Sequence, residues 1–515
     1  MANETEWQVT MPESSTQESK YSKWLWRTWT SFAQNGVRIW VWLLNFLQIM
    51  ASKVADFVKK IGKVAEDDPR KVIHGIKVGI ALTVVSLFYY ARPLYDCVGG
   101  NSIWAVMTVV MVFEFTVGGC LYKGFNRAMA TLCAAALAVG IHWIASKSGE
   151  ELKPIILSAS VFLLGSVATF SRFIPAVKAR FEYGVIIFIL TFSLVAVSGY
   201  RVDELLALAQ QRASTVAIGI CICVLVCILI CPVWSGEGLH LLVSRNMEMI
   251  ADSLEGMLLI ELCAIKEGAA TGNGSPSAKL QGYKCVLSAQ ASENSQANLA
   301  KWEPPHGHFG FRHPWSQYLK VGAAMRECAC CMEALDGCTH SEPIQGPAYV
   351  KKNLGNACMR LGAGSSKVLK ELAISLKSMR KSQKLGLLIE EMKDAVQEVR
   401  GALESFAVQL IVPPNSTSAE GATEEKQQSA VAAVSIKQLM ETMPAITVAS
   451  LLIEISERID GVVEAVNTLA DLACFESVDI EGKPPCLAES KSLEQDTMKA
   501  TQEDNGISLC LVAEV

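Results

Sequence analysis

Six long apolar runs before residue 235 constrain this chain more than any other feature. They cover residues 72–90, 102–118, 128–145, 154–170, 183–199 and 213–231. A helix needs roughly 17 to 25 residues to cross the hydrocarbon core of a bilayer, which is about 30 Å thick. Strands of a membrane β-barrel would be about half as long and would alternate in polarity, unlike these runs. We therefore predict six transmembrane helices.

The composition agrees with a membrane protein. Hydrophobic residues make up 51% of the 515 residues, and charged residues only 19%. Lys and Arg total 46 against 51 Asp and Glu, so no basic excess supports nucleic acid as a partner. The 17 cysteines are irregularly spaced and many lie inside apolar runs, which favours free thiols over a secreted disulfide scaffold.

The stretch before the first run has a different character. Residues 1–20 are polar, so they do not form a cleavable signal peptide. Residues 37–50 are apolar but short for a span, and Asn45 and Gln48 interrupt them. Five of the 11 tryptophans lie between residues 24 and 42, among basic residues. This pattern predicts an amphipathic helix on the cytosolic leaflet; a seventh span is the alternative.

Basic residues beside the runs predict the orientation, because cytosolic loops are enriched in Lys and Arg. The opposite loops contain fewer basic residues, and acidic residues offset them. The amino terminus is thus predicted to be cytosolic, and six spans return the carboxyl half to the same side. The basic residues that decide this are Lys59, Lys60, Lys63, Arg70, Lys71, Lys123, Arg127, Arg172, Lys178 and Arg180.

After Trp234 the chain shows helical apolar periodicity with charged faces, in residues 239–266, 315–336, 350–380, 385–412 and 434–474. We therefore predict an all-α protein in which a six-helix transmembrane domain is followed by a helical cytosolic domain. The predicted parts are a polar amino terminus with the interfacial segment (1–65), the transmembrane domain (66–233), the cytosolic domain (234–475) and a disordered tail (476–515).

Charged residues inside or at the ends of the runs are candidate site residues. A charge facing lipid at the bilayer centre costs about 2.5 to 3.5 kcal/mol on insertion scales, so such residues usually face a partner or a water-filled path. Rings of basic residues select anions in a pore. For Lys77 and Arg172 the alternative is that they extend to the headgroups. Glu114 is expected to pair with a base. The basic candidates are Lys77, Lys123, Arg127, Arg172, Arg180 and Arg201.

No catalytic pattern competes with this interpretation. The sequence lacks a Gly-rich phosphate loop with Lys, a His-Glu-x-x-His motif and a Gly-x-Ser-x-Gly elbow. The group Cys328, Cys330, Cys331, Cys338 and His340 lacks the spacing of zinc ligands. We predict neither an enzyme, nor a cofactor, nor a bound metal.

Six sequence stretches carry a family resemblance. They are DPRKVIHGIKVGIALTVVSLFYY (68–90), WAVMTVVMVFEFTVGG with KGFNR (104–127), RFIPAVKARFEYG (172–184), IFILTFSLVAVSGYR (187–201), CPVWSGEGLH (231–240) and WEPPHGHFGFRHPW (302–315). In this order they resemble the plant aluminium-activated malate transporter family, over residues 66–475. The last stretch contains the family's Trp-Glu-Pro motif.

The resemblance implies a function. Members of the family are anion channels: homodimers with six transmembrane helices per subunit, a pore lined by basic residues and a helical cytosolic domain. The expected partners are malate, inorganic anions such as chloride and nitrate, a second copy of the chain and the lipid bilayer. The expected location is the plasma membrane, with the vacuolar membrane as the alternative. A proton-coupled secondary organic-acid exporter and a membrane-anchored scaffold remain alternative functions.

The resemblance also assigns residues. Pore-lining bases fall on Lys77, Arg172 and Arg201, with Lys123, Arg127, Lys178 and Arg180 near the cytosolic mouth. Trp302, Glu303 and Pro304 form the Trp-Glu-Pro motif and, with Glu114, are expected to be structural or gating residues. Aluminium-responsive members carry acidic clusters on the extracellular side, whereas only Asp203 and Glu204 follow Arg201 here. Activation by aluminium is therefore not expected.

Overall fold

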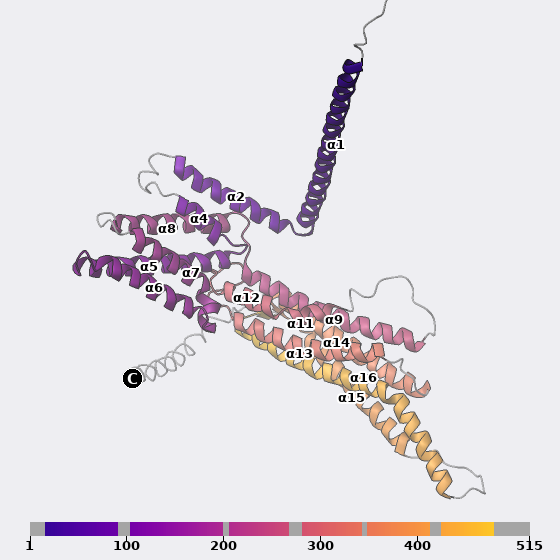
Figure 1. The fold of residues 1–515 in the computed structure, drawn as a ribbon. Coiled ribbons are helices and arrows are strands. Elements are labelled where there is room, and N and C mark those ends of the chain that lie inside the picture. The colour runs from indigo at the N-terminus through magenta and orange to yellow at the C-terminus, as the bar shows by residue number, and fades with distance from the viewer. Residues whose placement is uncertain are drawn as a thin grey trace, which may run out of the picture. The chain divides into compact units, whose positions relative to one another are not determined.

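The computed structural model describes residues 16–90, 103–198, 205–266, 281–341, 348–411 and 424–477. Within these ranges 87% of the chain is helical, in 14 helices, which confirms the all-α prediction. The chain divides into two units, Met1–Ile80 and Ala81–Val515. The elements are labelled in Figure 1.

The first unit contains helix α1 (Thr16–Asp67) and the beginning of α2 (Pro69–Tyr90). Pro69 starts α2 because proline lacks an N–H and fits the first turn of a helix. Asp68 caps this turn by accepting a hydrogen bond from the Arg70 N–H at 3.2 Å. Within α1, residues Trp40–Asp67 are long and apolar enough to cross a membrane. The helix is therefore longer than the apolar run at 37–50, and both the interfacial and the spanning position of this segment remain predictions.

The second unit begins with the membrane helices, which lie side by side in Figure 1. Long apolar segments of α5, α6, α7 and α8 match the last four predicted runs. Together with the segment in α1 they make five candidate spans among the described residues, and α2, which contains the first predicted run, is not one of them. The membrane helices are α4 (Ile103–Val112), α5 (Val117–Lys147), α6 (Lys153–Ser171), α7 (Pro175–Ser198) and α8 (Leu205–Leu229).

The prediction of one continuous helix over 102–118 is wrong. Helix α4 ends at Val112, residues 113–116 are not helical, and α5 begins at Val117. Thr116 causes the break, because its side chain caps α5 by accepting a hydrogen bond from the Gly119 N–H at 3.2 Å. The residues on both sides of this cap are apolar, so the run continues through the break.

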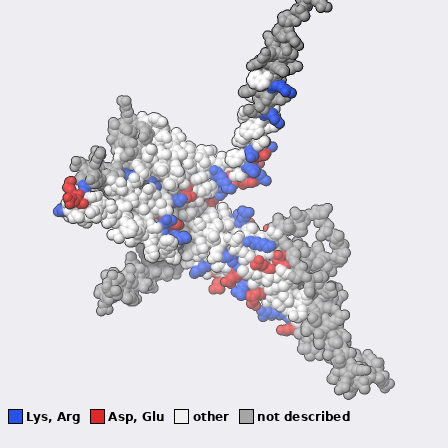
Figure 2. All heavy atoms as spheres, viewed as in Figure 1, with Lys and Arg blue, Asp and Glu red and all other residues white. Residues whose placement is uncertain are grey.

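The surface over α4–α8 is almost uncharged, and charged side chains gather at the ends of these helices (Figure 2). Inside the membrane part, the small residues Ala134 and Ala138 of α5 pack on Phe192 of α7. Small residues allow membrane helices to approach closely. The long apolar helices and this surface identify a multi-pass membrane protein.

The rest of the second unit is the carboxyl-terminal bundle, defined as α9 and α11–α16 (Figure 1). All five helices predicted after Trp234 are present, whereas α11 and α12 were not predicted because both are short. A tiny parallel ladder joins β1 (Arg380–Lys381) to β2 (Glu476–Ser477). The helices are α9 (Ser235–Lys266), α11 (Gly282–Ser288), α12 (Gln290–Ala300), α13 (Trp315–Ser341), α14 (Ala348–Ser378), α15 (Leu385–Ile411) and α16 (Glu424–Leu472).

The bundle has one continuous apolar core. Side chains from α9, α13, α14 and α16 meet in it, including the fully buried Leu239, Met325, Leu361 and Ile459. This core explains the helical periodicity of the sequence, since each long helix turns its apolar stripe inward. Residues 478–515, most of the predicted tail, lie outside the described ranges.

Candidate functional site

Two arginines are buried inside the membrane part. Arg127 on α5 is only 4% exposed, and Arg212 on α8 is 8% exposed. Arg127 Nη1 donates a hydrogen bond to the Tyr183 hydroxyl on α7 at 3.2 Å. The guanidinium of Arg212 lies over the Trp104 ring, 3.7 Å from its centroid. Within the described chain, the Nε atom of each arginine is buried without a hydrogen-bond partner.

The described acids of the membrane part do not neutralise these two arginines. The ion pairs there join Lys123 to Glu114 and Arg172 to Glu182. Because burying a charge without a partner of opposite sign is costly, these two arginines are candidate site residues.

Of the remaining predicted bases, Lys123 and Arg172 each pair with a carboxylate. Lys123 pairs with Glu114, which lies in the break between α4 and α5, so Glu114 does contact a base as expected. Arg172 at the end of α6 lies 3.0 Å from the Glu182 carboxylate on α7. The Arg180 side chain is exposed. Lys77, which is 1% exposed, belongs to the first unit, and Arg201 lies outside the described residues.

Glu303 joins the membrane part to the carboxyl-terminal bundle. Its side chain is only 1% exposed. Oε1 accepts hydrogen bonds from the backbone N–H groups of Gly118 at 3.2 Å and Ser235 at 2.5 Å, and Oε2 accepts one from Gly236 at 3.0 Å. Gly118 lies in the first turn of α5, and Ser235 and Gly236 begin α9. The first N–H groups of a helix lack partners and carry positive partial charge, so one carboxylate caps both helices.

Trp302 and Pro304 extend this contact. The Trp302 ring packs against Tyr122 and Phe125 of α5, at centroid distances of 5.7 and 5.2 Å. The Pro304 carbonyl accepts a hydrogen bond from His306 Nδ1 at 2.9 Å. We call Trp302, Glu303 and Pro304, with the backbone groups that they hold, the Trp-Glu-Pro clasp.

Comparison with known proteins decides the family. A family profile described as "Aluminium activated malate transporter" matches residues 62–434. The chain belongs to this family. It is 47% identical over 454 residues to aluminum-activated malate transporter 10 of Arabidopsis thaliana, covering 85% of this chain and 90% of the relative. It is 39% identical over 443 residues to aluminum-activated malate transporter 1 of Triticum aestivum, covering 84% and 89%.

Membership confirms the sequence resemblance and the prediction that the chain is not an enzyme, since these relatives are named as transporters. In this aluminium-activated malate transporter family member, the Trp-Glu-Pro motif is thus a contact between helix ends. The sequence analysis missed Arg212, because the last predicted span began at residue 213. The apolar residues Leu205 to Leu208, which extend the helical pattern backwards, were the signal that could have found it.

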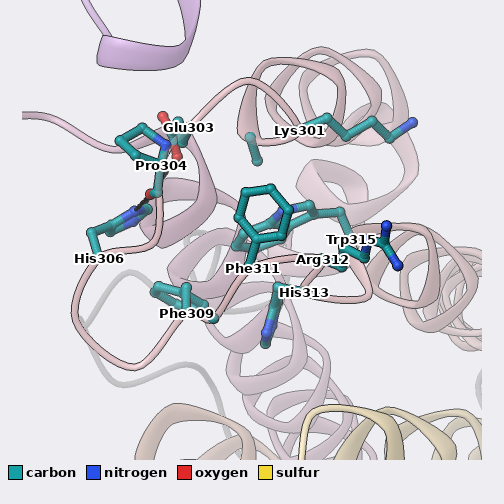
Figure 3. Close-up of a pocket in the computed structure, with 11 residues that line it drawn as sticks. Lys301, Glu303, Pro304, His306, Phe309, Phe311, Arg312, His313 and Trp315 are labelled. Carbon is teal, nitrogen blue, oxygen red and sulfur yellow. Dashed lines mark hydrogen bonds and ion pairs between the residues drawn. The ribbon is translucent and has the colours of Figure 1, made fainter. Parts of the chain in front are cut away.

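A pocket of about 250 Å³ lies beside the clasp in this family member (Figure 3). Two of its aromatic residues, Phe309 and Phe311, and its two bases, Lys301 and Arg312, belong to the loop between α12 and α13. We call the part of the pocket formed by Lys301 and Arg312 its rim. Its lining residues are Ala300, Lys301, Glu303, Pro304, His306, Phe309, Gly310, Phe311, Arg312, His313 and Trp315.

His313, which lines the pocket, and the buried His240 share one hydroxyl. The Tyr318 hydroxyl lies 3.0 Å from His240 Nδ1 and 3.3 Å from His313 Nε2. Burial lowers the pKa of His240. Burial, with repulsion from His240 and His306, lowers the pKa of His313 to about 4. Both rings are therefore neutral near pH 7, and the core beneath the clasp stays uncharged.

The cysteine group on α13 includes a fully buried thiol. Burial raises the pKa of Cys328 to about 12, so this side chain is a thiol at neutral pH. Across the described ranges, no group of three His, Cys, Asp or Glu residues has an arrangement that could hold a metal ion.

Proposed function

We propose that this protein conducts malate and smaller anions, such as chloride and nitrate, passively through a pore in a homodimer. The relatives that it matches are named malate transporters. The observation that carries the proposal is the burial of Arg127 and Arg212 in the membrane part without a carboxylate partner among the described residues.

The chemistry of malate suits such a path. Malate carries two carboxylates near pH 7, and guanidinium groups can replace their hydration with charge-assisted hydrogen bonds. Binding must remain weak enough for the anion to leave. One charge crossing 100 mV is worth about 2.3 kcal/mol, so a dianion leaving a negative cytosol gains roughly 4.6 kcal/mol. This gain is sufficient without a pump.

The other predicted residues have proposed places along this path. Lys77, Arg172 and Arg201 would line it, and Lys123 and Arg180 would lie toward its cytosolic mouth. Glu182 partly neutralises Arg172, which makes Arg172 a weaker anion ligand than Arg127. The carboxyl-terminal bundle would be cytosolic, because the bases at the clasp end of α5 and α7 predict that side.

The clasp would couple the bundle to the pore. Glu303 holds the first turn of α5, and Arg127 lies on the same helix. A shift of α9 would therefore reach the helix that carries the pore arginine. We place the protein in the plasma membrane, with the vacuolar membrane as the alternative; a fluorescent fusion in plant cells distinguishes the two.

Voltage clamp in a heterologous membrane tests the conduction. Malate or chloride is the sole permeant anion, and Arg127→Gln and Arg212→Gln are compared with the native chain at matched surface expression. We expect each variant to lower the anion conductance at least about tenfold, which corresponds to losing about 1.4 kcal/mol of anion stabilisation. Lys367→Gln, on the exposed surface of α14, is the control and should leave the current unchanged.

Two results would contradict the proposal. Currents that are unchanged in both arginine variants would show that other residues determine the anion selectivity. Anion flux that is electrically small, saturable and dependent on a pH gradient would indicate the proton-coupled exporter instead. Light scattering of the purified full chain tests the homodimer, for which we expect two copies per particle.

A further inference from the structure

The loop between α12 and α13 exposes two pairs of neighbouring basic and aromatic residues. Lys301 precedes Trp302, and Phe311 precedes Arg312. Phe311 is 81% exposed and Trp302 38%, and both bases are exposed. Lys301, Phe311 and Arg312 all line the pocket beside the clasp. An aromatic ring beside a cation is the usual combination at a membrane interface.

The contacts of Trp302 place this loop at headgroup depth. Trp302 packs on Tyr122 and Phe125, near the beginning of α5. Helix α5 has 31 residues, and at about 1.5 Å per residue it is about 46 Å long. A hydrocarbon core of about 30 Å leaves roughly ten of its residues outside. The apolar run of α5 begins at residue 128, after Lys123 and Arg127, so most of these residues belong to its amino-terminal end. Phe125, which is 49% exposed, therefore lies near the edge of the core, and the loop lies beside it.

The exposed charges of the pocket are positive, whereas its negative charge is buried. Its carboxylate, Glu303, is almost fully buried and already accepts three backbone hydrogen bonds. Lys301 and Arg312 extend together on the side away from Glu303 and His306 (Figure 3). Lys301 donates a hydrogen bond to the neutral Asn298 amide at 3.4 Å, and among the described residues no acid forms an ion pair with Lys301 or Arg312. The rim therefore offers two cations to an anionic group.

We propose that this pocket binds the phosphate headgroup of an anionic phospholipid from the adjacent leaflet. The phosphate would lie between Lys301 and Arg312, because a guanidinium binds phosphate oxygens with paired hydrogen bonds and a lysine adds a point charge. Phe311 would enter the interface beside the acyl chains. The lipid would thereby hold the clasp against the bilayer. This inference does not depend on which anions the protein conducts.

Photo-crosslinking tests the site on the full-length protein. The protein is reconstituted in phosphatidylcholine vesicles that contain a photoactivatable phosphatidic acid, and the labelled peptides are mapped by mass spectrometry. We expect labelling within residues 301–315. The double variant Lys301→Gln with Arg312→Gln should reduce it about 25-fold, since each base beside an anionic leaflet contributes about fivefold. Phe311→Ser should reduce it less.

Matched variants show whether a loss of labelling comes from the lost binding site, from misfolding or from the lower net charge of the protein. Arg360→Gln with Lys367→Gln removes the same two charges from α14 and should leave the labelling unchanged. Lys301→Arg with Arg312→Lys keeps both charges and should retain most of it. Undiminished labelling in the Gln double variant would overturn the proposal. Displacement of the probe by millimolar malate or inorganic phosphate would also overturn it, because the pocket would then be a site for soluble anions.

Discussion

Glu303 Oε1 accepts a hydrogen bond from the Gly118 N–H at 3.2 Å, across 185 residues of chain. The same carboxylate holds the first residues of α9. The first turn of α5 and the first turn of the carboxyl-terminal bundle are therefore parts of one contact. Because Lys123 and Arg127 follow on α5, we expect a motion of α9 to reach bases of the proposed path.

Glu303→Gln should loosen this contact. The amide keeps one accepting oxygen, but its NH₂ group would face a backbone N–H donor. A buried donor without an acceptor costs about 1–3 kcal/mol. We expect a lower unfolding temperature and a shifted or weakened voltage dependence, measured by thermal unfolding of the full chain and by voltage clamp. Glu327→Gln, a 63% exposed position on α13, is the control. Native behaviour of Glu303→Gln would show that the clasp does not control opening.

Gly236→Ala should disturb the clasp by overpacking. A Cβ at this position would meet the Trp315 indole, whereas a Cβ at Gly238 would lie 3.5 Å from the Gln296 side chain, an ordinary contact. Overpacking costs about 1–3 kcal/mol, and alanine is favoured over glycine in a helix by about 1 kcal/mol. We expect Gly236→Ala to lower the unfolding temperature and Gly238→Ala to leave it unchanged or raise it. Equal effects of the two variants would contradict this geometry.

Arg172→Gln should affect conduction less than Arg127→Gln. Arg172 pairs with Glu182 at 3.0 Å, and the two side chains are 36% and 43% exposed. Such exposed pairs contribute at most about 1 kcal/mol. We expect Arg172→Glu to lower the current, because it places two acids side by side. The double variant Arg172→Glu with Glu182→Arg exchanges the two charges and should recover the current. Voltage clamp measures all three variants. An Arg172→Gln defect as large as that of Arg127→Gln would make Arg172 a principal pore residue.

Acid should destabilise the protein through His313. Its pKa in the folded chain is about 4, below the ordinary value of 6.5, so the folded state binds this proton less readily than the unfolded state. The stability is therefore complete above pH 6.5 and is lost progressively as the pH falls from 6.5 to 4. His240 shifts in the same direction. Thermal unfolding between pH 8 and 4 measures the slope.

Substitutions test whether His313 and His240 cause this dependence of stability on pH. His313→Gln should flatten the loss of stability between pH 6.5 and 4, because the substituted side chain takes up no proton. His308→Gln, at an exposed position on the same loop, removes only a minor repulsion from His240 and should change the slope much less. A native slope in His313→Gln would assign the acid sensitivity to other groups.

Much of the architecture could be predicted because its signals are local. The length of an apolar run decides whether a helix can cross a bilayer, so the last four runs and their helices agree. The 3.6-residue apolar period likewise predicted the five long helices of the bundle. The break at 113–116 escaped this reasoning, because a cap such as Thr116 interrupts hydrogen bonding without interrupting the apolar run.

The sequence by itself determined that this chain is a helical membrane protein, and its motifs pointed to the family. Only the tertiary structure decided that Glu303 caps two helices and that Arg212 is buried within a membrane helix. The physical reason is that the partners of Glu303 are backbone N–H groups, which every residue but proline carries and no motif can mark. Burial of Arg212 likewise depends on neighbours such as Trp104, which are distant in sequence and meet it only in the folded chain.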